Sequence, residues 1–481
     1  MKAWNELFEL ARPAFAQHRT FERARGLAAC GLACLGRRTI SGLLCTAGQQ
    51  FADWSSAYRL FEQERLDLDA LWRVPLHNVL TELPASAPVV ALIDDTLVRK
   101  RGQHISGTSW RRDPLGPHFT DNFIWASRFL QISLALPAAP GVPASGARAI
   151  PVDLVHAPSP RKPSRRATPE QWQVWRTASA ASAISGKGAQ RIFALRQAID
   201  EEAGRDRQLI VCADATFTNH TVLNALPPRT VLIGRIRKDA RLFALPTPDQ
   251  ENHGRGRHRC YGDPLPTPEQ YRQSQSLGWK RVGAFAAGST HTFHVKIVSP
   301  VRWKHAGGDR QLQLLIVRAL PYRLRKWGPR SYRRPAYLIC TDPTMSPQQI
   351  LQAYLWRWEI EVNFRDEKTL LGLGQPQVRT EPAVRTTASF AVFIYALLLL
   401  ALHRCRLANS PLPSPRWQRP NPKRPVVRIT TQQAIALFRA ELWASALGLP
   451  NKSGFVASFT PATKPLKTLN GLQSAVLYAS G

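Results

Sequence analysis

Two short apolar segments, each followed directly by aspartate, constrain the fold of this chain most strongly. Residues 89–93 are all apolar and precede Asp94 and Asp95, and residues 209–213 are all apolar and precede Asp214. A short continuous apolar run of this kind is typical of a strand buried on both faces. A carboxylate at the end of such a strand is held rigidly at the edge of a sheet. The sequence therefore predicts core strands that end in candidate functional acids.

The order of the expected elements predicts an α/β fold with a mixed sheet, because three strands come first and helices then alternate with strands. After the first apolar run, strands are expected at 128–136 and 149–156, a long helix at 168–203, a strand at 208–212, a short helix at 220–226 and a strand at 230–236.

The chain divides into five expected segments. Residues 1–80 are helical and are interpreted either as a DNA-binding domain or as a helical cap on the core. The others are the first part of an α/β core (86–236), a β-rich insertion (237–345), the second part of the core (346–408), and a basic linker with a C-terminal helical region (409–481). The insertion has 20 Lys and Arg against 7 Asp and Glu, which favours a DNA-facing surface.

A helix is expected over residues 354–368, and its charges are sorted by face. At about 100° per residue, one stripe about 80° wide holds a single carboxylate with a tyrosine and three cations. Its members are Tyr354, Arg357, Glu361, Arg365 and Lys368. Charge on a helix usually means a solvated salt-bridge face. A lone acid among cations also fits a metal ligand beside bound phosphates, since Mg²⁺ binds carboxylate and phosphate oxygens.

These residues carry a resemblance. Tyr354, Arg357, Glu361 and Lys368 match the spacing of the YREK signature of bacterial insertion-sequence transposases, in the IS-four-like group of the DDE superfamily. The segments around Asp95 and Asp214 resemble the two aspartate motifs of that group. The long basic segment before Glu361 resembles its β-rich insertion. The resemblance implies an RNase H-like catalytic core that performs cut-and-paste transposition.

The resemblance also implies the site. Asp95, Asp214 and Glu361 would hold two Mg²⁺ ions, with Mn²⁺ able to substitute, and Asp95 is preferred to Asp94 because it directly precedes a threonine. Two such metals activate water and stabilise the leaving 3′-oxygen, and the freed 3′-OH then attacks target DNA. Residues expected to contact the DNA are Tyr354, Arg357, Arg365, Lys368, Arg99, Lys100, Arg111 and Arg112.

One motif departs from the group's pattern. Members that cleave through a DNA hairpin stack a flipped base on a tryptophan in the strand before the signature helix. The strand here carries Tyr337, with Trp327 in the preceding loop, so a hairpin step stays open.

Composition bears on partners and location. The net charge of +32 predicts a polyanionic partner, and the resemblance specifies double-stranded DNA, namely the element's terminal repeats and the target. A homodimer is implied, because two ends must be held together. The apolar run at 388–402 is too short to span a bilayer and is expected to be a buried helix. Scattered cysteines favour a reducing compartment, so the expected location is the bacterial cytoplasm, at the nucleoid.

Two alternatives remain at this stage. The chain could be an RNase H-like nuclease that cuts DNA without joining it, or a repurposed DNA-binding protein without catalysis. All three candidate acids are present, which argues against the second alternative.

Overall fold

The structure is a computed structural model. The residues it describes are 2–49, 51–113, 116–117, 119–120, 122–139, 142, 144–247, 259–323, 325, 327–407 and 428–446. Most of the basic linker expected after residue 408 and the chain from 447 onward lie outside these residues.

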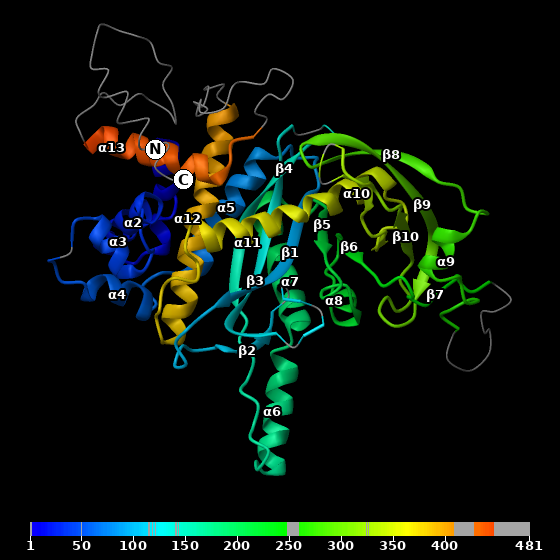
Figure 1. Cartoon of the computed structure of the whole chain (residues 1–481), viewed down its shortest axis with the longest axis horizontal. Helices are drawn as coiled ribbons and strands as arrows, with labels where there is room; N and C mark the ends of the chain where they lie inside the picture. Colours follow the sequence, from blue (N-terminus) through cyan, green and yellow to red (C-terminus); the bar gives the residue numbers. More distant parts are fainter. Residues whose placement is uncertain are drawn as a thin grey trace, which may run out of the picture.

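A mixed sheet forms the centre of the molecule (Figure 1). Its core strands are β1 (Val89–Arg99), β3 (Phe123–Pro137), β4 (Ala147–His156), β5 (Leu209–Ala213) and β6 (Thr230–Arg235). They lie in the order β4-β3-β1-β5-β6, and β2 (Ser109–Arg112) pairs with β3. β3 pairs antiparallel with both β1 and β4, whereas β5 and β6 run parallel to β1. This order and these directions are those of an RNase H-like core, and they confirm the predicted mixed α/β fold.

The strands of the basic segment extend this sheet beyond β6. β13 (Ala336–Cys340) pairs with β6, and β10 (Leu312–Val317) and β9 (Ser289–Trp303) follow. The remaining elements of the segment are β7 (Leu242–Phe243), α9 (Pro268–Gln273), β8 (Lys280–Ala286), β11 (Pro321–Tyr322) and β12 (Ser331–Tyr332). The sheet therefore runs continuously from the core into the β-rich segment.

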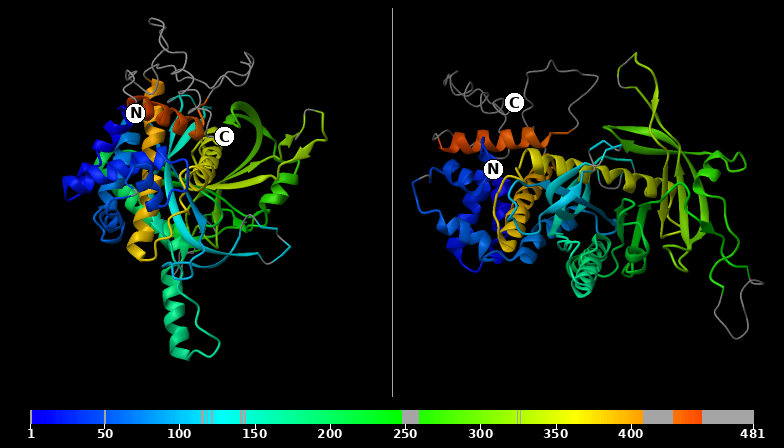
Figure 2. Two further views of the ribbon diagram at one scale, coloured as in Figure 1. Left: turned by 60° about the vertical axis from the view of Figure 1, so that its left-hand side comes forward. Right: turned by 60° about the horizontal axis from the view of Figure 1, so that its bottom comes forward.

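Helices cover both faces of the sheet. α7 (Ile184–Ala203) and α8 (His220–Asn224) contact each other on one face, and α10 (Pro347–Trp356) and α11 (Trp358–Thr369) contact the sheet on the other. The single helix expected over 168–203 is wrong, because it is divided into α6 (Pro169–Ala181) and α7. Ala183 between them has an extended backbone, and the Ser182 hydroxyl bonds the Ser179 carbonyl, as serine does when it competes with a helix. α6 buries no residue and projects from the body (Figures 1 and 2).

The N-terminal helices pack against the apolar helix α12 (Glu381–Leu407) and against α13 (Thr431–Ala446) (Figure 2). They are α1 (Lys2–Glu9), the 3₁₀ turn η1 (Arg12–Ala14), α2 (His18–Ala33), α3 (Ile40–Thr46), α4 (Ser55–Glu62) and α5 (Leu68–Glu82). α12 is apolar enough to cross a membrane, but 94% of its apolar window is buried inside the protein. The predicted buried helix is confirmed.

Candidate active site

Asp94 and Asp214 lie side by side where the parallel pairing of β1 with β5 ends. The strand end expected before Asp94 is wrong, because β1 stays paired with β3 as far as Arg99. Ile93 of β1 and Ala213 of β5 are partners in the strand register, so Asp94 and Asp214 follow the same rung of the sheet. The Asp214 carboxylate accepts hydrogen bonds from the backbone N–H and the hydroxyl of Thr216, at 2.8 and 3.1 Å. These bonds fix the carboxylate of Asp214 in the turn that leaves the sheet.

The two members of the aspartate doublet point to opposite faces, because successive side chains alternate along a strand. Val90 and Leu92 pack in the apolar cluster that includes α10 and α11, so Asp94 lies on that face. Ala91 and Ile93 pack in the cluster that includes α7, so Asp95 lies on the other. Asp95 accepts two hydrogen bonds from the Arg128 guanidinium, at 2.7 and 2.9 Å. The structure thus brings Asp94, rather than the preferred Asp95, to the face that carries Glu361.

Arg357 joins the carboxylates of this face. It lies at the one-residue turn between α10 and α11, and its two terminal nitrogens donate to Asp94 at 2.7 Å and to Glu361 at 2.8 Å. The side chains of Asp94 and Arg357 are 17% and 13% exposed, whereas Glu361 is 35% exposed. Asp94, Asp214 and Glu361 are therefore gathered around one guanidinium.

Burial and charge set the electrostatics of this cluster. Desolvation raises the pKa of Asp94 to about 7, against the opposing effect of Arg357 and with a further rise from Asp214. Burial lowers the pKa of Arg357, but Asp94, Tyr354, Glu361 and Asp214 raise it above its ordinary value overall. The site therefore holds more negative charge than one guanidinium neutralises when all three acids are ionised.

The residues present fit a hard divalent cation. Carboxylate oxygens are the donors that Mg²⁺ prefers, and two of the three side chains follow the last paired residues of β1 and β5. The Arg357 guanidinium is a cation already seated between Asp94 and Glu361. Among the described residues, no group of three or more His, Cys, Asp or Glu side chains is placed to hold a metal ion. Asp94, Asp214 and Glu361 are the residues that would hold the cation.

A groove of about 1920 Å³ adjoins the cluster. Tyr354 of α10, Arg357 at the turn and Trp358 of α11 line it, together with residues of β8, β9 and the loop after β10. Further Arg and His side chains in the lining are Arg148, Arg318, Arg333, Arg428, His291, His294 and His403. Glu359 is the acid of the described lining, and it pairs with Arg428. Because arginines outnumber this acid, the groove suits a nucleic-acid backbone.

The other residues expected to contact DNA from α11 lie at its C-terminal half. Arg365 is 66% exposed and pairs with Asp366. Lys368 lies over the Phe364 ring at 5.9 Å, and burial lowers its pKa. The residues of the predicted stripe thus take two kinds of position. Arg357 and Glu361 lie beside Asp94, whereas Arg365 lies at the surface.

The cations after the first aspartates take different positions. Arg99 is 72% exposed and pairs with Asp113, and Arg112 is exposed. Lys100 instead donates to the carbonyls of Gly374 and Pro376, at 3.2 and 2.7 Å, and burial lowers its pKa to about 8. Arg111 is half-buried and donates to Ser159.

Two features escaped the sequence analysis. One is Arg128, the partner of Asp95. It lies on β3 two positions from Leu130, which faces Asp95 in the strand pairing, and this position follows only from the register of β1 with β3. The second is the pair of Trp110, which is exposed, and Trp125, which is half-buried; their side-by-side position follows from the pairing of β2 with β3. Tyr337, which the sequence favoured as a core residue, is 5% exposed and donates to Glu269.

Comparison with known proteins agrees with this geometry. A family model described as DDE superfamily endonuclease matches residues 13–298, which is more than half of the chain and includes both aspartate segments. No curated protein is similar enough in sequence to match. Members of this superfamily act on DNA by phosphoryl transfer and generally use divalent metals such as Mg²⁺. The RNase H-like sheet and the two aspartates beside it are consistent with this match. Because the match covers more than half of the chain, the chain belongs to the DDE superfamily endonuclease family.

Proposed function

We propose that this protein is a DNA transposase of the IS-four-like group, which moves an insertion sequence by cut-and-paste transposition. The observation that carries the proposal is the cluster of Asp94, Asp214 and Glu361 around Arg357, since a third carboxylate joins the two strand-end aspartates. Glu361 lies beyond the matched residues 13–298, so its assignment depends on this geometry. Tyr354 of α10, Arg357 at the turn, and Glu361 and Lys368 of α11 carry the spacing that resembles the YREK signature.

In this proposal Asp94 replaces Asp95 as the first metal ligand. Asp94 shares a face with Glu361, whereas Asp95 is bound by Arg128. Two Mg²⁺ ions, or Mn²⁺ in their place, would supply an activated water and stabilise the leaving 3′-oxygen. Tyr354, Arg357 and the basic groove would orient the DNA backbone so that the scissile phosphate lies over the carboxylates.

The expected domain organisation is part of the proposal. The helical N-terminal region would bind the terminal repeats of the element, and the β-rich segment 237–345 would face the DNA. A dimer would hold the two ends together, with the C-terminal helical region as the contact. We propose that the protein works in the bacterial cytoplasm, at the nucleoid.

Strand transfer separates a transposase from a nuclease that only cuts. The substrate is a pre-cleaved end of the DNA that flanks the gene, with a free 3′-OH, mixed with a target plasmid and Mg²⁺. We expect joined product from the wild-type protein and none from Glu361→Gln. The variant Glu62→Gln, at an exposed position on α4, is the matched control and should join as the wild type does. Cleavage of uncut substrate without any joining would favour the nuclease.

A further inference from the structure

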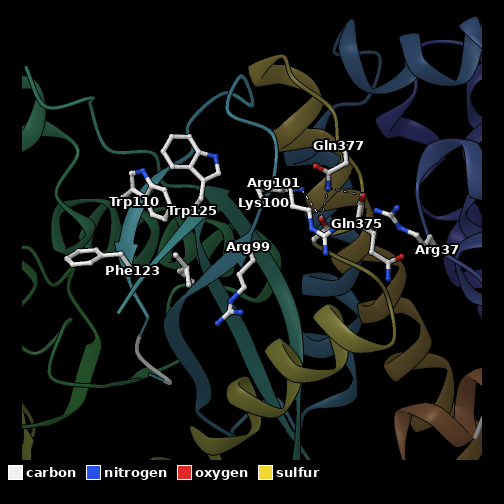
Figure 3. A pocket seen from close by; sticks show the side chains of 11 residues that line it. Arg37, Arg99, Lys100, Arg101, Trp110, Phe123, Trp125, Gln375 and Gln377 are labelled. Carbon is white, nitrogen blue, oxygen red and sulfur yellow. Dashed lines mark hydrogen bonds between the residues drawn. The ribbon is translucent and has the colours of Figure 1, made fainter. Parts of the chain in front are cut away.

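A second pocket lies at the opposite edge of the sheet from the β-rich segment. It has a volume of about 890 Å³ and is open to the surface. The end of β1, the β2–β3 hairpin, the loop after α11 and the N-terminal helical region all contribute to it. Figure 3 shows aromatic side chains on one side and cations with two glutamines on the other.

The aromatic side of the pocket is exposed and preorganised. Trp110 and Trp125 are direct partners in the β2–β3 register, and their rings meet edge to face at 5.6 Å. The indole N–H of Trp125 donates to the Gly102 carbonyl at 3.0 Å, which fixes its ring. Trp110 is 66% exposed and Phe123, on the same hairpin, is 54% exposed. Single exposed aromatics are common, but two exposed aromatics beside the half-buried Trp125 in one pocket mark an interaction site.

The other side of the pocket is cationic. Arg37 and Arg101 are exposed and Arg99 is 72% exposed, and they come from two distant parts of the chain. Lys100 ties this side together by bonding the carbonyls of Gly374 and Pro376. Of the described residues that line the pocket, none is acidic. The pocket therefore presents flat apolar surfaces beside positive charges.

This combination suits unpaired nucleotides. The face of an unpaired base can stack on an aromatic ring, at about 1–3 kcal/mol per base, while arginines neutralise the phosphates. In duplex DNA the base faces are covered by their neighbours, so a duplex uses only the cations.

The pocket is within reach of the carboxylates. Arg99 lies five positions after Asp94 on the same strand, which corresponds to about 17 Å at about 3.4 Å per residue. A few nucleotides of DNA cover this distance, and alternation along β1 places Arg99 on the face of Asp95.

We infer that this pocket binds an unpaired segment of the DNA strand, with bases stacked on Trp110 and Phe123 and phosphates on Arg37, Arg99 and Arg101. The inference rests on the proposed function for its DNA substrate. It assigns single-strand capture to the β2–β3 hairpin, a segment to which the sequence analysis gave only cationic contacts.

The test is a binding measurement on the full chain in EDTA, so that no cleavage contributes. Fluorescence anisotropy is read with a labelled thymidine 12-mer and, separately, with a blunt duplex of the same length. We expect Trp110→Ala and Phe123→Ala each to weaken binding of the single strand by about tenfold and to leave duplex affinity unchanged. Phe193→Ala, which removes an aromatic side chain that is 49% exposed on α7, is the matched control and should bind as the wild type does.

The contrary results are distinct. Wild-type affinity for the single strand in both hairpin variants would overturn the inference, as would an equal loss for the duplex. A loss confined to Phe193→Ala would also overturn it. Since EDTA removes the chemistry, a failed strand-transfer assay would not by itself reject this pocket, and a failed binding test would leave the carboxylate cluster unaffected. Competition by an RNA 12-mer as strong as that by DNA would overturn the assignment to DNA.

Discussion

At the scale of single residues, the doublet Asp94-Asp95 shows what sequence reasoning reached and what it could not. The buried strand was predictable from the apolar run, but its end was not, because β1 continues past the aspartates to Arg99 through its pairing with β3. The orientation was not, because a strand that is apolar on both faces gives no alternation from which to assign a face. Only the packing of β1 between α7 and α11 assigns Asp94 to the side of Glu361.

Two of the three acids outside the predicted stripe of α11, Asp366 and Glu367, are buried, whereas Glu359 is half-buried and pairs with Arg428. Asp366 accepts hydrogen bonds from Thr431 of α13 at 2.6 Å and from Tyr395 of α12 at 3.5 Å. Glu367 is fully buried, and the Gln131 amide donates to it at 3.0 Å. The helical wheel separated these residues from the stripe correctly, but their burial depends on helices far away in the sequence.

Glu367 makes stability depend on pH. Burial raises its pKa from 4.5 to about 8, against the opposing effects of Gln131 and Lys368 and with a further rise from Asp366. Because the folded pKa is the higher one, its contribution to stability is fully present below the unfolded pKa and is lost as pH rises toward 8. We expect Glu367→Gln to raise the free energy of unfolding at pH 8 by a few kcal/mol, which is the order of magnitude that a pKa shift of this size allows. At pH 4 the substitution should change the free energy of unfolding little.

Chemical denaturation of the metal-free protein at both pH values measures this effect. Glu62→Gln, at an exposed position, should follow the wild type at each pH. A Glu367→Gln variant less stable than the wild type at pH 8 would show that the carboxylate is ionised and stabilising there.

At the scale of elements, the apolar strand segments were predictable, whereas the single helix expected over 354–368 is wrong, because α10 ends at Trp356 and α11 begins at Trp358. The connection between α5 and β1 was not predictable either. Arg207, just before β5, donates to four carbonyls at the end of α5 and in the loop that follows it, those of Leu80, Leu83, Pro84 and Ala87. The sequence shows only a charged residue before a strand. Its role depends on a contact across more than 100 residues.

Replacing Arg207 should therefore destabilise the fold. Arg207→Met keeps the length of the side chain but leaves four carbonyls without this donor, and we expect a loss of about 2–4 kcal/mol in the free energy of unfolding. Arg205→Met, two positions away at an exposed site, is the matched control and should lose less than about 0.5 kcal/mol. Urea unfolding followed by circular dichroism distinguishes the two, and equal stability of both variants would contradict the role of Arg207.

At the scale of the whole molecule, the N-terminal helices share one apolar cluster with the sheet. Trp4 and Phe8 of α1, Phe393 of α12 and Phe438 of α13 belong to it, and their rings contact one another. The sequence predicted helices at both ends of the chain. It could not predict that they pack together, because such long-range contacts leave no local periodicity.

The charge of the whole molecule predicts a strong salt dependence. A net charge of +32, a basic groove beside the carboxylates and a cationic pocket at the far edge should together neutralise several phosphates. For about six contacts, affinity for duplex DNA should fall by about a thousandfold between roughly 50 and 200 mM salt. Anisotropy titrations across this range measure the slope, and a flat response would exclude the phosphate backbone as the main contact.

The cluster of Asp94, Asp214 and Glu361 is the central claim, and cleavage by matched variants tests it most directly. Asp94→Asn and Asp95→Asn change adjacent positions of one strand by the same atoms, and a plasmid that carries the gene with its flanking DNA serves as substrate with Mg²⁺. We expect Asp94→Asn to bind DNA but not to cleave it, because it removes a metal ligand. Asp95→Asn should still cleave, because it changes only the pair with Arg128 on the opposite face. Cleavage by folded Asp94→Asn, together with its loss in folded Asp95→Asn, would contradict the account.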